Sequence, residues 1–460
     1  MYRRIDRAQI SMDEFYIPFG GKLLEDNRWV KIAKLMPWEL VEDLYAGTFK
    51  EETSDGRPPI SAQIAFGSLY IKEQENLTDE RTVENITENP YMQYFLGLSE
   101  FQQTQLFDPS MMVHFRKRFT KEMVEKINEE LYRRMNPPKP AKDGGNNGKL
   151  ILDATAAPAD VRYPTDISLL NECRENTEKM IDEIWEHTER KGHKTAYNRR
   201  LARKEYLKLA KQRKPRKNKI KQGIQKQLDC VKKNLVTLDR LMTESKVPLH
   251  NKRIERLEII RKAVYQQQEM LNNKTHSCTD RIVNLRQSHV RPIVRGKARS
   301  PAEFGQKLAF SVVNGFTFIE QQSWDNFSEG QTLIESAEKY KARHGVYPEA
   351  ILADMTYRNR ENISFCKKNG IRLSGPRLGR PKVVEVENDK VQAYRDNCER
   401  NMIESRNGIA KRRFGLGLIM STLSSTAETE VSLNVLVMNV AHVLRVFLRF
   451  FSIRWILVFQ

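Results

Sequence analysis

The sequence predicts an α/β protein, and three observations lead to this fold class. Short apolar runs have the length and composition of buried strands at residues 149–156, 308–313, 316–320 and 350–354. The pair Asn314-Gly315 between two of these runs is the strongest short signal for a β-hairpin. Residues 165–290, in contrast, follow the pattern of long polar helices. We therefore expect a sheet whose first strand is followed by a helical insertion.

The first 140 residues predict a helical domain. Its basic helix is expected to begin with Asp108 as the N-cap and Pro109 at the first helical position. That helix carries Arg116 and Arg118. A compact helical module with a basic helix suits DNA binding and dimerisation equally well, so both alternatives stay open.

The second half of the chain continues the strand pattern after the hairpin. Helices are predicted at residues 330–340, 358–368 and 388–413, and further strands at 350–354 and 370–374. By analogy, five strands in this chain order are typical of a ribonuclease-H-like core.

Composition divides the chain into four regions. Residues 136–148 are rich in Pro and Gly and predict a linker. The expected regions are a helical N-terminal DNA-binding or dimerisation domain (1–140), a ribonuclease-H-like catalytic core (149–164 and 291–420), a basic, coiled-coil-like helical insertion (165–290) and an apolar C-terminal helical segment packed on the core (421–460).

The C-terminal segment is the most apolar part of the sequence. A membrane-spanning helix needs about 20 apolar residues, and this segment is interrupted by Arg445, Arg449 and Arg454. We therefore expect a buried terminal helix and no membrane anchor. The charged first ten residues lack the apolar core of a secretory signal.

Charge is the most informative bulk property of the 460 residues. There are 78 Lys and Arg against 59 Asp and Glu, a net charge of +19, which predicts a polyanionic partner. The five cysteines include no C-x-x-C pair, which argues against a disulfide framework or a zinc ribbon and fits a reducing compartment.

The insertion supplies most of this charge. Residues 190–221 contain 15 Lys or Arg and one acid, Glu205. Such a surface would neutralise DNA phosphates with little sequence preference; the alternative is a solvated spacer or dimer contact. The expected DNA-binding residues here are Arg199, Arg200, Arg203, Lys204, Arg213, Lys214, Arg216 and Lys217. Apolar residues at roughly heptad spacing over 228–241 predict an antiparallel helical hairpin.

Three acidic residues are the candidates for chemistry. Asp153 lies inside one apolar strand and Asp354 ends another, where a lone buried carboxylate would be costly. If the two strands lie side by side and parallel, both carboxylates reach the edge where α/β sheets bind ligands. Glu404 on the last charged helix shares a face with Arg400 and Lys411. Singly, each acid is explained as well by a turn or a solvated helix face.

Together, three carboxylates favour one chemistry. Mg²⁺ or Mn²⁺ takes oxygen ligands, and two such ions can promote phosphodiester displacement. Basic side chains beside the acids would bind DNA phosphates. The candidates are Arg400, Lys411, Arg406 and the Gly/Pro-rich loop residues Arg377 and Arg380.

The sequence resembles bacterial insertion-sequence transposases of the DDE type, in the IS-four/IS-five-like superfamily. The resemblance lies in residues 150–155 (LILDAT), 352–358 (LADMTYR) and Arg400-x3-Glu404-x6-Lys411. The last is similar to the family pattern Y-x2-R-x3-E-x6-K, except that Asn397 stands at the Tyr position. The helical residues 56–119 also resemble the N-terminal domain of these proteins.

This resemblance implies a function. Asp153, Asp354 and Glu404 would be the catalytic, metal-binding triad of a DDE transposase that cleaves DNA at insertion-sequence ends and transfers the strand into target DNA. The implied partners are the terminal inverted repeats and target DNA. A homodimer or larger synaptic complex and a cytoplasmic, nucleoid-associated location are also expected. Two alternatives remain, a catalytically silent DNA-binding derivative and a nuclease that joins no strands.

Overall fold

The structure is a computed structural model that describes residues 11–17, 21–49, 59–137, 145–186, 199–245, 249–297, 300–376 and 386–458. It forms two compact units. Unit 1 comprises Met1–Pro158, Lys307–Ser323 and Phe327–Gln460, and unit 2 comprises Ala159–Gln306 and Trp324–Asn326. The predicted loop residues Arg377 and Arg380 and most of the predicted linker lie outside the described residues.

The N-terminal part of unit 1 is helical. Its helices are α1 (Arg28–Leu35), α2 (Trp38–Ala46), α3 (Ala62–Glu75), α4 (Asp79–Glu88), α5 (Pro90–Phe95), α6 (Met111–Arg118) and α7 (Lys121–Met135), after a short 3₁₀ turn η1 (Met12–Glu14). Helix α3 is buried on nearly all sides. Gly67 permits this packing, because a Cβ there would lie 2.4 Å from Leu96 Cδ2.

The predicted start of the basic helix is wrong by two residues. Helix α6 begins at Met111, with Ser110 as its N-cap. The Asp108 carboxylate instead accepts a hydrogen bond from the Ser110 backbone N–H at 2.9 Å, so it closes a turn before the helix. The Asn89-Pro90 pair does start a helix in the expected way: Asn89 caps α5 and Pro90 occupies its first turn.

Unit 1 also contains most of a mixed sheet, so the predicted α/β class is confirmed. The strands are β1 (Lys149–Pro158), β3 (Ser300–Val313), β4 (Phe316–Ser323), β5 (Ala350–Leu352) and β6 (Arg372–Leu373). Their spatial order is β4-β3-β1-β5-β6. β1 pairs with β5 and β5 with β6 in parallel, whereas β3 and β4 are antiparallel.

The hairpin prediction is confirmed in detail. Val313 pairs with Phe316 across a two-residue turn, and Asn314 and Gly315 have φ angles of 50° and 81°. Positive φ at both central residues is the mark of the turn that matches strand twist, and Asn-Gly adopts it readily.

One strand was not predicted from the sequence. β2 (Arg291–Lys297) pairs with the first half of β3, and β3 begins at Ser300, before the apolar run at 308–313. The paired residues of this extension, 291–305, belong to unit 2. β2 contains Pro, Gly and two Arg residues. This composition is tolerated in an edge strand but lacks the apolar pattern by which strands are predicted.

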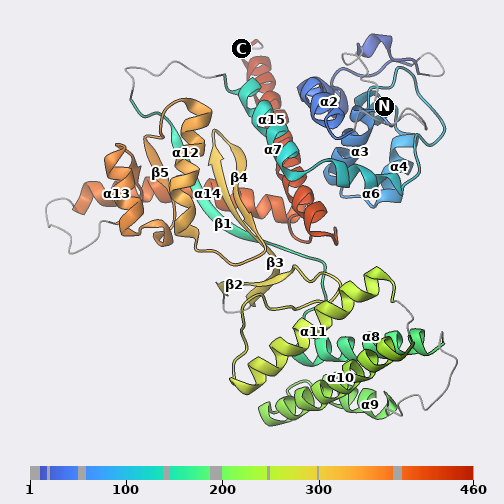
Figure 1. The fold of residues 1–460 in the computed structure, drawn as a ribbon. Helices are drawn as coiled ribbons and strands as arrows, with labels where there is room; N and C mark the ends of the chain where they lie inside the picture. The colour runs from blue at the N-terminus through green and yellow to red at the C-terminus, as the bar shows by residue number, and fades with distance from the viewer. Residues whose placement is uncertain are drawn as a thin grey trace. The chain divides into compact units, whose positions relative to one another are not determined.

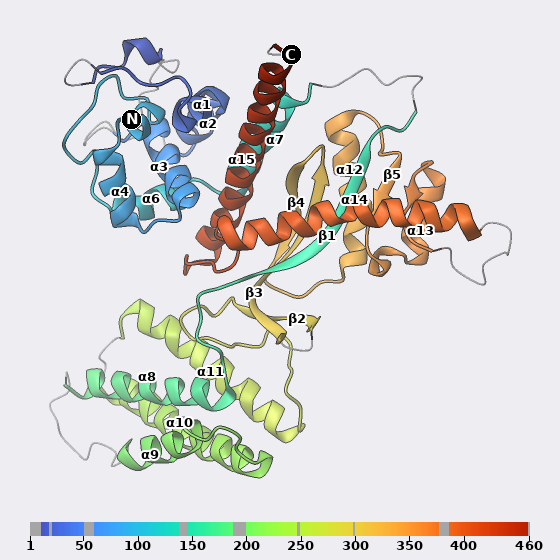
Figure 2. The ribbon, with the colours of Figure 1, turned by 180° about the vertical axis from the view of Figure 1, so that it is seen from behind.

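Helices cover the sheet of unit 1 on both faces. Helix α12 (Leu333–His344) and helix α14 (Val386–Arg413) both contact β1, and the opposite views in Figures 1 and 2 show them on opposite sides of it. Helix α13 (Arg360–Lys368) contacts α12 and β6. Because α14 crosses the β1 face, side chains on this helix can reach the end of the first strand.

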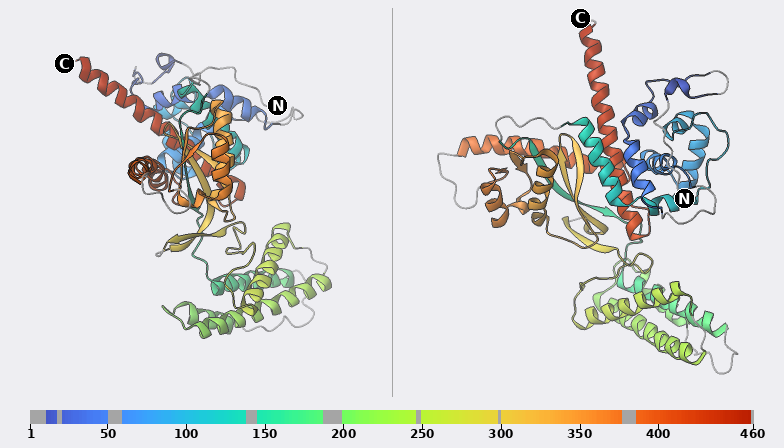
Figure 3. Two further views of the ribbon diagram at one scale, coloured as in Figure 1. Left: turned by 90° about the vertical axis from the view of Figure 1, so that its left-hand side faces the viewer. Right: turned by 45° about the horizontal axis from the view of Figure 1, so that its top comes forward.

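The C-terminal helix α15 (Ser424–Val458) packs against α7, α3 and β4, and Figure 3 shows it alongside α7. Asn439 is fully buried. Its side-chain amide bonds both the N–H and the C=O of Thr317 on β4, at 2.9 and 2.8 Å, and donates to Asn128 Oδ1 on α7 at 2.8 Å. Among the described residues, no helix is long and apolar enough to cross a membrane.

Unit 2 is a helical bundle with the β2–β3 extension. Its helices are α8 (Asp166–Glu186), α9 (Arg199–Ala210), α10 (Lys217–Ser245) and α11 (Asn251–Asn272). The predicted apolar positions of α10 are buried in the bundle core. Helix α10 packs most extensively against α8, with smaller contacts to α9 and α11. The predicted hairpin of α10 and its successor is therefore only part of a four-helix arrangement.

Candidate active site

Two predicted aspartates occupy equivalent positions along neighbouring parallel strands, Asp153 within β1 and Asp354 just after β5. β1 and β5 are parallel, and Ile151 pairs with Leu352. Asp153 and Asp354 each follow two residues later along their chains. The carboxyl ends of parallel strands meet at one edge of the sheet, so the register brings both aspartates to the same edge. Asp354 also caps the short turn η5 (Met355–Tyr357), accepting the Met355 N–H at 2.6 Å.

Glu404 reaches this edge from α14 through a shared arginine. Arg400 Nη1 lies 4.0 Å from Asp354 Oδ1, and Arg400 Nη2 lies 4.0 Å from Glu404 Oε1. The Asp354 and Glu404 side chains are 50% and 63% exposed, whereas that of Arg400 is 20% exposed. The guanidinium thus lies between two solvent-accessible carboxylates.

Asp153 is the most buried of the three acids. Burial raises the pKa of its carboxyl group to about 6, against the effect of a hydrogen bond from the Ala154 backbone N–H. The negative charges of Glu329 and Glu404 also raise this pKa, and the positive charge of Arg400 lowers it. Asp153 therefore lies within electrostatic reach of Glu404 and Arg400, in surroundings with excess negative charge.

Sequence analysis missed several neighbours of Asp153. The Asn407 amide, on α14, donates to Asp153 Oδ2 at 2.8 Å and fixes the carboxylate. Asn407 lies three residues after Glu404 on the same helix, and this i, i+3 spacing is the sequence signal that could have identified it. Glu329, in the turn η4 (Glu329–Thr332), pairs with Lys307 at 3.2 Å. Nothing in the sequence around Glu329 marks it.

Tyr357 lies within electrostatic reach of three acids, Glu329, Asp153 and Asp354. It is fully buried. Burial raises the pKa of its hydroxyl, and the charges of Glu329, Asp153 and Asp354 raise it further.

The donor set suits a hard divalent cation in its chemistry. The three predicted ligands are carboxylates, and oxygen donors are what Mg²⁺ and Mn²⁺ prefer. The pKa of Asp153 is raised mainly by burial and further by the charges of Glu329 and Glu404, and a bound cation would favour its ionised form. However, among the described residues no three His, Cys, Asp or Glu side chains are gathered closely enough to hold an ion. The positively charged side chain beside Asp354 and Glu404 is Arg400, at 4.0 Å from each.

The other predicted DNA-binding residues of unit 1 differ in their placement. Lys411 is half-buried on α14. Arg406 is 7% exposed, and burial, with a smaller effect of Arg445, lowers the pKa of its guanidinium to about 10. The expected phosphate contact of Arg406 does not agree with this burial. The reason is helical periodicity, because Arg406 lies two residues from Glu404 and so faces the opposite side of α14.

Two predicted N-terminal contacts are engaged within their own domain. Arg116 forms a bidentate ion pair with Asp79, at 2.8 and 2.6 Å. Arg118 stacks on the ring of Phe49 at 4.0 Å and contacts Thr48. Both therefore have structural partners that a sequence alone could not assign.

In unit 2 the predicted cations divide into two groups. Arg199 is paired with Asp182 at 2.6 Å. The other seven are exposed: Arg200, Arg203, Lys204, Arg213, Lys214, Arg216 and Lys217.

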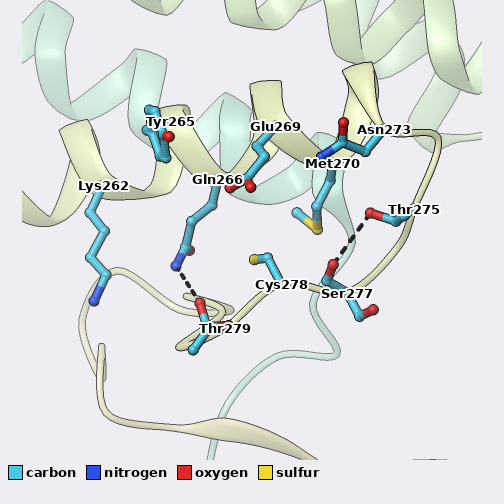
Figure 4. A pocket seen from close by; sticks show the side chains of 10 residues that line it. All are labelled: Lys262, Tyr265, Gln266, Glu269, Met270, Asn273, Thr275, Ser277, Cys278 and Thr279. Atoms are coloured by element: carbon cyan, nitrogen blue, oxygen red, sulfur yellow. Dashed lines mark hydrogen bonds between the residues drawn. The ribbon is translucent and has the colours of Figure 1, made fainter.

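Unit 2 contains a pocket of about 430 Å³ (Figure 4). It lies between α11 and residues 275–279. Gln266 donates to the Thr279 and Asp280 carbonyls at 3.1 and 2.9 Å, and burial raises the pKa of the Cys278 thiol. The Gln266 amide already has hydrogen-bond partners and the Cys278 thiol stays protonated. We therefore assign no chemistry to this pocket.

Comparisons with known proteins cover parts of the chain. Residues 351–441 match the family model of the transposase DDE domain, and residues 19–118 match that of a transposase domain (DUF772). The first range contains Asp354, Arg400 and Glu404, and neither range contains the insertion.

One relative of this chain is found by sequence. An uncharacterised protein, ORF8 in the nfe locus of Rhizobium meliloti, is 29% identical over 143 residues, which are 30% of this chain and 66% of that protein. The chain thus covers just under two thirds of the relative. No solved structure matches. The resemblance to DDE transposases predicted from the motifs is confirmed by the two family matches.

Proposed function

We propose that this protein is a DNA transposase that cleaves phosphodiester bonds at the ends of an insertion sequence and joins the freed strand to target DNA. One observation carries the proposal. Asp153 and Asp354 each follow a paired residue of the parallel strands β1 and β5 by two positions, and Arg400 lies 4.0 Å from both Asp354 and Glu404. Asp354, Arg400 and Glu404 lie within the range that resembles the DDE domain. The strand order β4-β3-β1-β5-β6 supports a ribonuclease-H-like core.

The roles of the side chains follow from their placement. Asp153, Asp354 and Glu404 would hold Mg²⁺ or Mn²⁺. When bound, the cations supply an activated oxygen nucleophile and stabilise the leaving oxygen. Asn407 orients the Asp153 carboxylate through its 2.8 Å hydrogen bond.

Arg400 and Lys411 would bind the DNA backbone on either side of Glu404. Both are on α14, four residues before Glu404 and seven after it, so the helix presents them on one face. Arg400 can engage a phosphate with two parallel hydrogen bonds, and doing so would take it away from the carboxylates it now neighbours.

The domain assignments extend the same proposal. We assign the core to 149–164 and 291–420, the N-terminal helical domain to 1–140 and the C-terminal segment to 421–460. The partners are the element's terminal inverted repeats and target DNA, and synapsis of two ends requires a dimer or larger complex. The protein would accordingly act at the nucleoid.

A strand-cleavage assay tests the proposal. The substrate is a DNA fragment carrying the inverted repeats that flank the gene, incubated with the full-length protein and Mg²⁺. We expect nicks at the repeat ends and joined products when target DNA is added. Nicks without joined products would indicate a nuclease, and DNA binding without any nicks would indicate a catalytically silent derivative.

A further inference from the structure

The outer face of α9 carries positive charge without acidic partners. Arg200, Arg203, Lys204 and Lys208 are exposed and fall within about 140° of arc on the helix. The buried residues of α9 lie on the opposite side: Ala202, Tyr206 and Leu209. The turn into α10 and its first residues add Lys211, Arg213, Lys214, Arg216, Lys217, Lys219 and Lys221, all exposed. We call these eleven residues the basic face.

The helix that carries the basic face is firmly seated in unit 2. Tyr206 and Leu209 pack on Ile167, and Gly223 allows close approach, since a Cβ there would lie 2.6 Å from Leu209 Cδ2. The Gln227 amide donates to the Ala202 carbonyl at 3.1 Å. Helix α9, with four of the eleven cations, is therefore held in place before any ligand binds, which lowers the entropy cost of binding.

The acids near α9 form their ion pairs with cations outside the basic face. Glu205 pairs with Lys226 of α10 at 2.8 Å, and Asp182 of α8 pairs with Arg199 at 2.6 Å. In the part of the chain that the structure describes, none of the eleven cations of the basic face forms an ion pair within 4.0 Å. An ordinary solvated surface interleaves both signs of charge.

We propose that the basic face binds the backbone of double-stranded DNA without sequence preference, separately from the carboxylate site. Helix α9 has 12 residues and is about 18 Å long. Four of the eleven cations lie on this length, and the other seven lie in the turn and the first residues of α10. Duplex DNA carries one negative charge per about 1.7 Å of axis, so a duplex lying along α9 offers about ten phosphates to these four cations. Contacts from these cations to phosphate oxygens position the protein on the duplex and carry no sequence information, so the face holds DNA without selecting a sequence.

The test measures binding with cleavage disabled. Full-length protein carrying Asp153→Asn, in EDTA, is titrated against a random-sequence duplex of about 30 base pairs over a range of salt. The face variant replaces Arg203, Lys204, Lys208 and Lys211 with Ala. The matched control replaces four exposed cations elsewhere in unit 2 with Ala: Lys232, Lys233, Lys252 and Arg286. Circular dichroism checks that both variants fold.

We expect the face variant to bind at least about 50-fold more weakly and its salt slope to fall by about 3 to 4, near 0.9 per lost contact. The control should change affinity less than about threefold. Equal losses in both variants would overturn the proposal, because net charge alone would then explain binding. Unchanged binding with altered sedimentation would also overturn it and identify a dimer contact. Tighter binding of a duplex RNA of equal length would overturn the choice of DNA.

This inference rests on the proposed function only in taking the polyanion to be DNA. The two can fail separately. Loss of binding by the face variant, together with no cleavage by the wild-type protein, would uphold the inference and sink the proposed function.

Discussion

The carboxylate edge of unit 1 and the basic face of unit 2 use cations in opposite ways. At the edge, one arginine lies 4.0 Å from each of two acids, and charges of both signs are concentrated around Asp153. On the basic face, eleven cations are solvated and the nearby acids are engaged elsewhere. The carboxylate edge depends on the precise positions of a few atoms, which is what catalysis requires. The basic face depends on its total charge, which is what binding to the DNA backbone requires.

The largest expected effect separates cleavage from binding. Asp153→Asn, Asp354→Asn and Glu404→Gln should each lower the cleavage rate by about 10³-fold or more, because each removes a proposed cation ligand. Affinity for random duplex DNA should stay within about twofold, since the basic face is untouched. Cleavage kinetics and fluorescence anisotropy measure the two quantities.

The matched control for these variants is Glu361→Gln. Glu361 is an exposed acid of α13, within the range that resembles the DDE domain. It should keep wild-type cleavage. Full activity of any one of the three site variants would remove that residue from the proposed triad.

The next effect concerns the arginine between the acids. Arg400→Gln should lower cleavage by about 10- to 100-fold through the lost phosphate contact. It should also tighten Mn²⁺ binding several-fold, because a positive charge near two carboxylates opposes a cation. Titration calorimetry with Mn²⁺ measures the second effect. Arg412→Gln, an exposed arginine on the same helix, is the control, and weaker Mn²⁺ binding by Arg400→Gln would contradict this account.

Much of this comparison could be predicted from sequence, and the limits have physical causes. The charge run on α9 and the Asn314-Gly315 hairpin depend on neighbouring residues, so local patterns sufficed. The pairing of Arg116 with Asp79 and the approach of Glu329 to Asp153 depend on segments far apart in the chain. Asp153 and Asp354 were predicted because carboxylates are unusual in or at the end of apolar strands, and Glu404 because of its spacing from Arg400 and Lys411. Asn407, in contrast, is ordinary in a polar helix.

A smaller effect comes from His442, a half-buried histidine that stays neutral near pH 7, unlike the cations of the basic face. Burial lowers the pKa of His442 to about 4, and the charges of Arg406 and Arg445 lower it further. Its unfolded-state pKa is about 6.5, so the native state binds fewer protons than the unfolded state between these values. Stability is therefore complete above about pH 6.5 and is lost as the pH falls towards 4, by about 2 kcal/mol after allowance for partial exposure.

Thermal unfolding at pH 7.5 and pH 5 measures this dependence. His442→Gln should lose less stability than the wild type on acidification, because glutamine does not titrate. His276→Gln, at an exposed position in unit 2, should behave as the wild type does. Identical pH dependence of His442→Gln and the wild type would mean that other groups carry the effect.

The smallest expected effect probes the one acid within the charge run. Glu205 is paired with Lys226 at 2.8 Å, and this pair, together with the Lys204 and Lys208 charges, lowers the pKa of its carboxyl group. Glu205→Gln removes a negative charge beside the basic face and leaves Lys226 without its partner. Affinity for random duplex DNA should rise about twofold at low salt, and the gain should vanish near 1 M salt, where charges are screened beyond about 3 Å. Cleavage at saturating DNA should not change, because the carboxylate edge is unaltered. A gain that persists at high salt would mean that Glu205 acts through packing of α9 on α10, and the electrostatic contrast between the two regions would then lose this support.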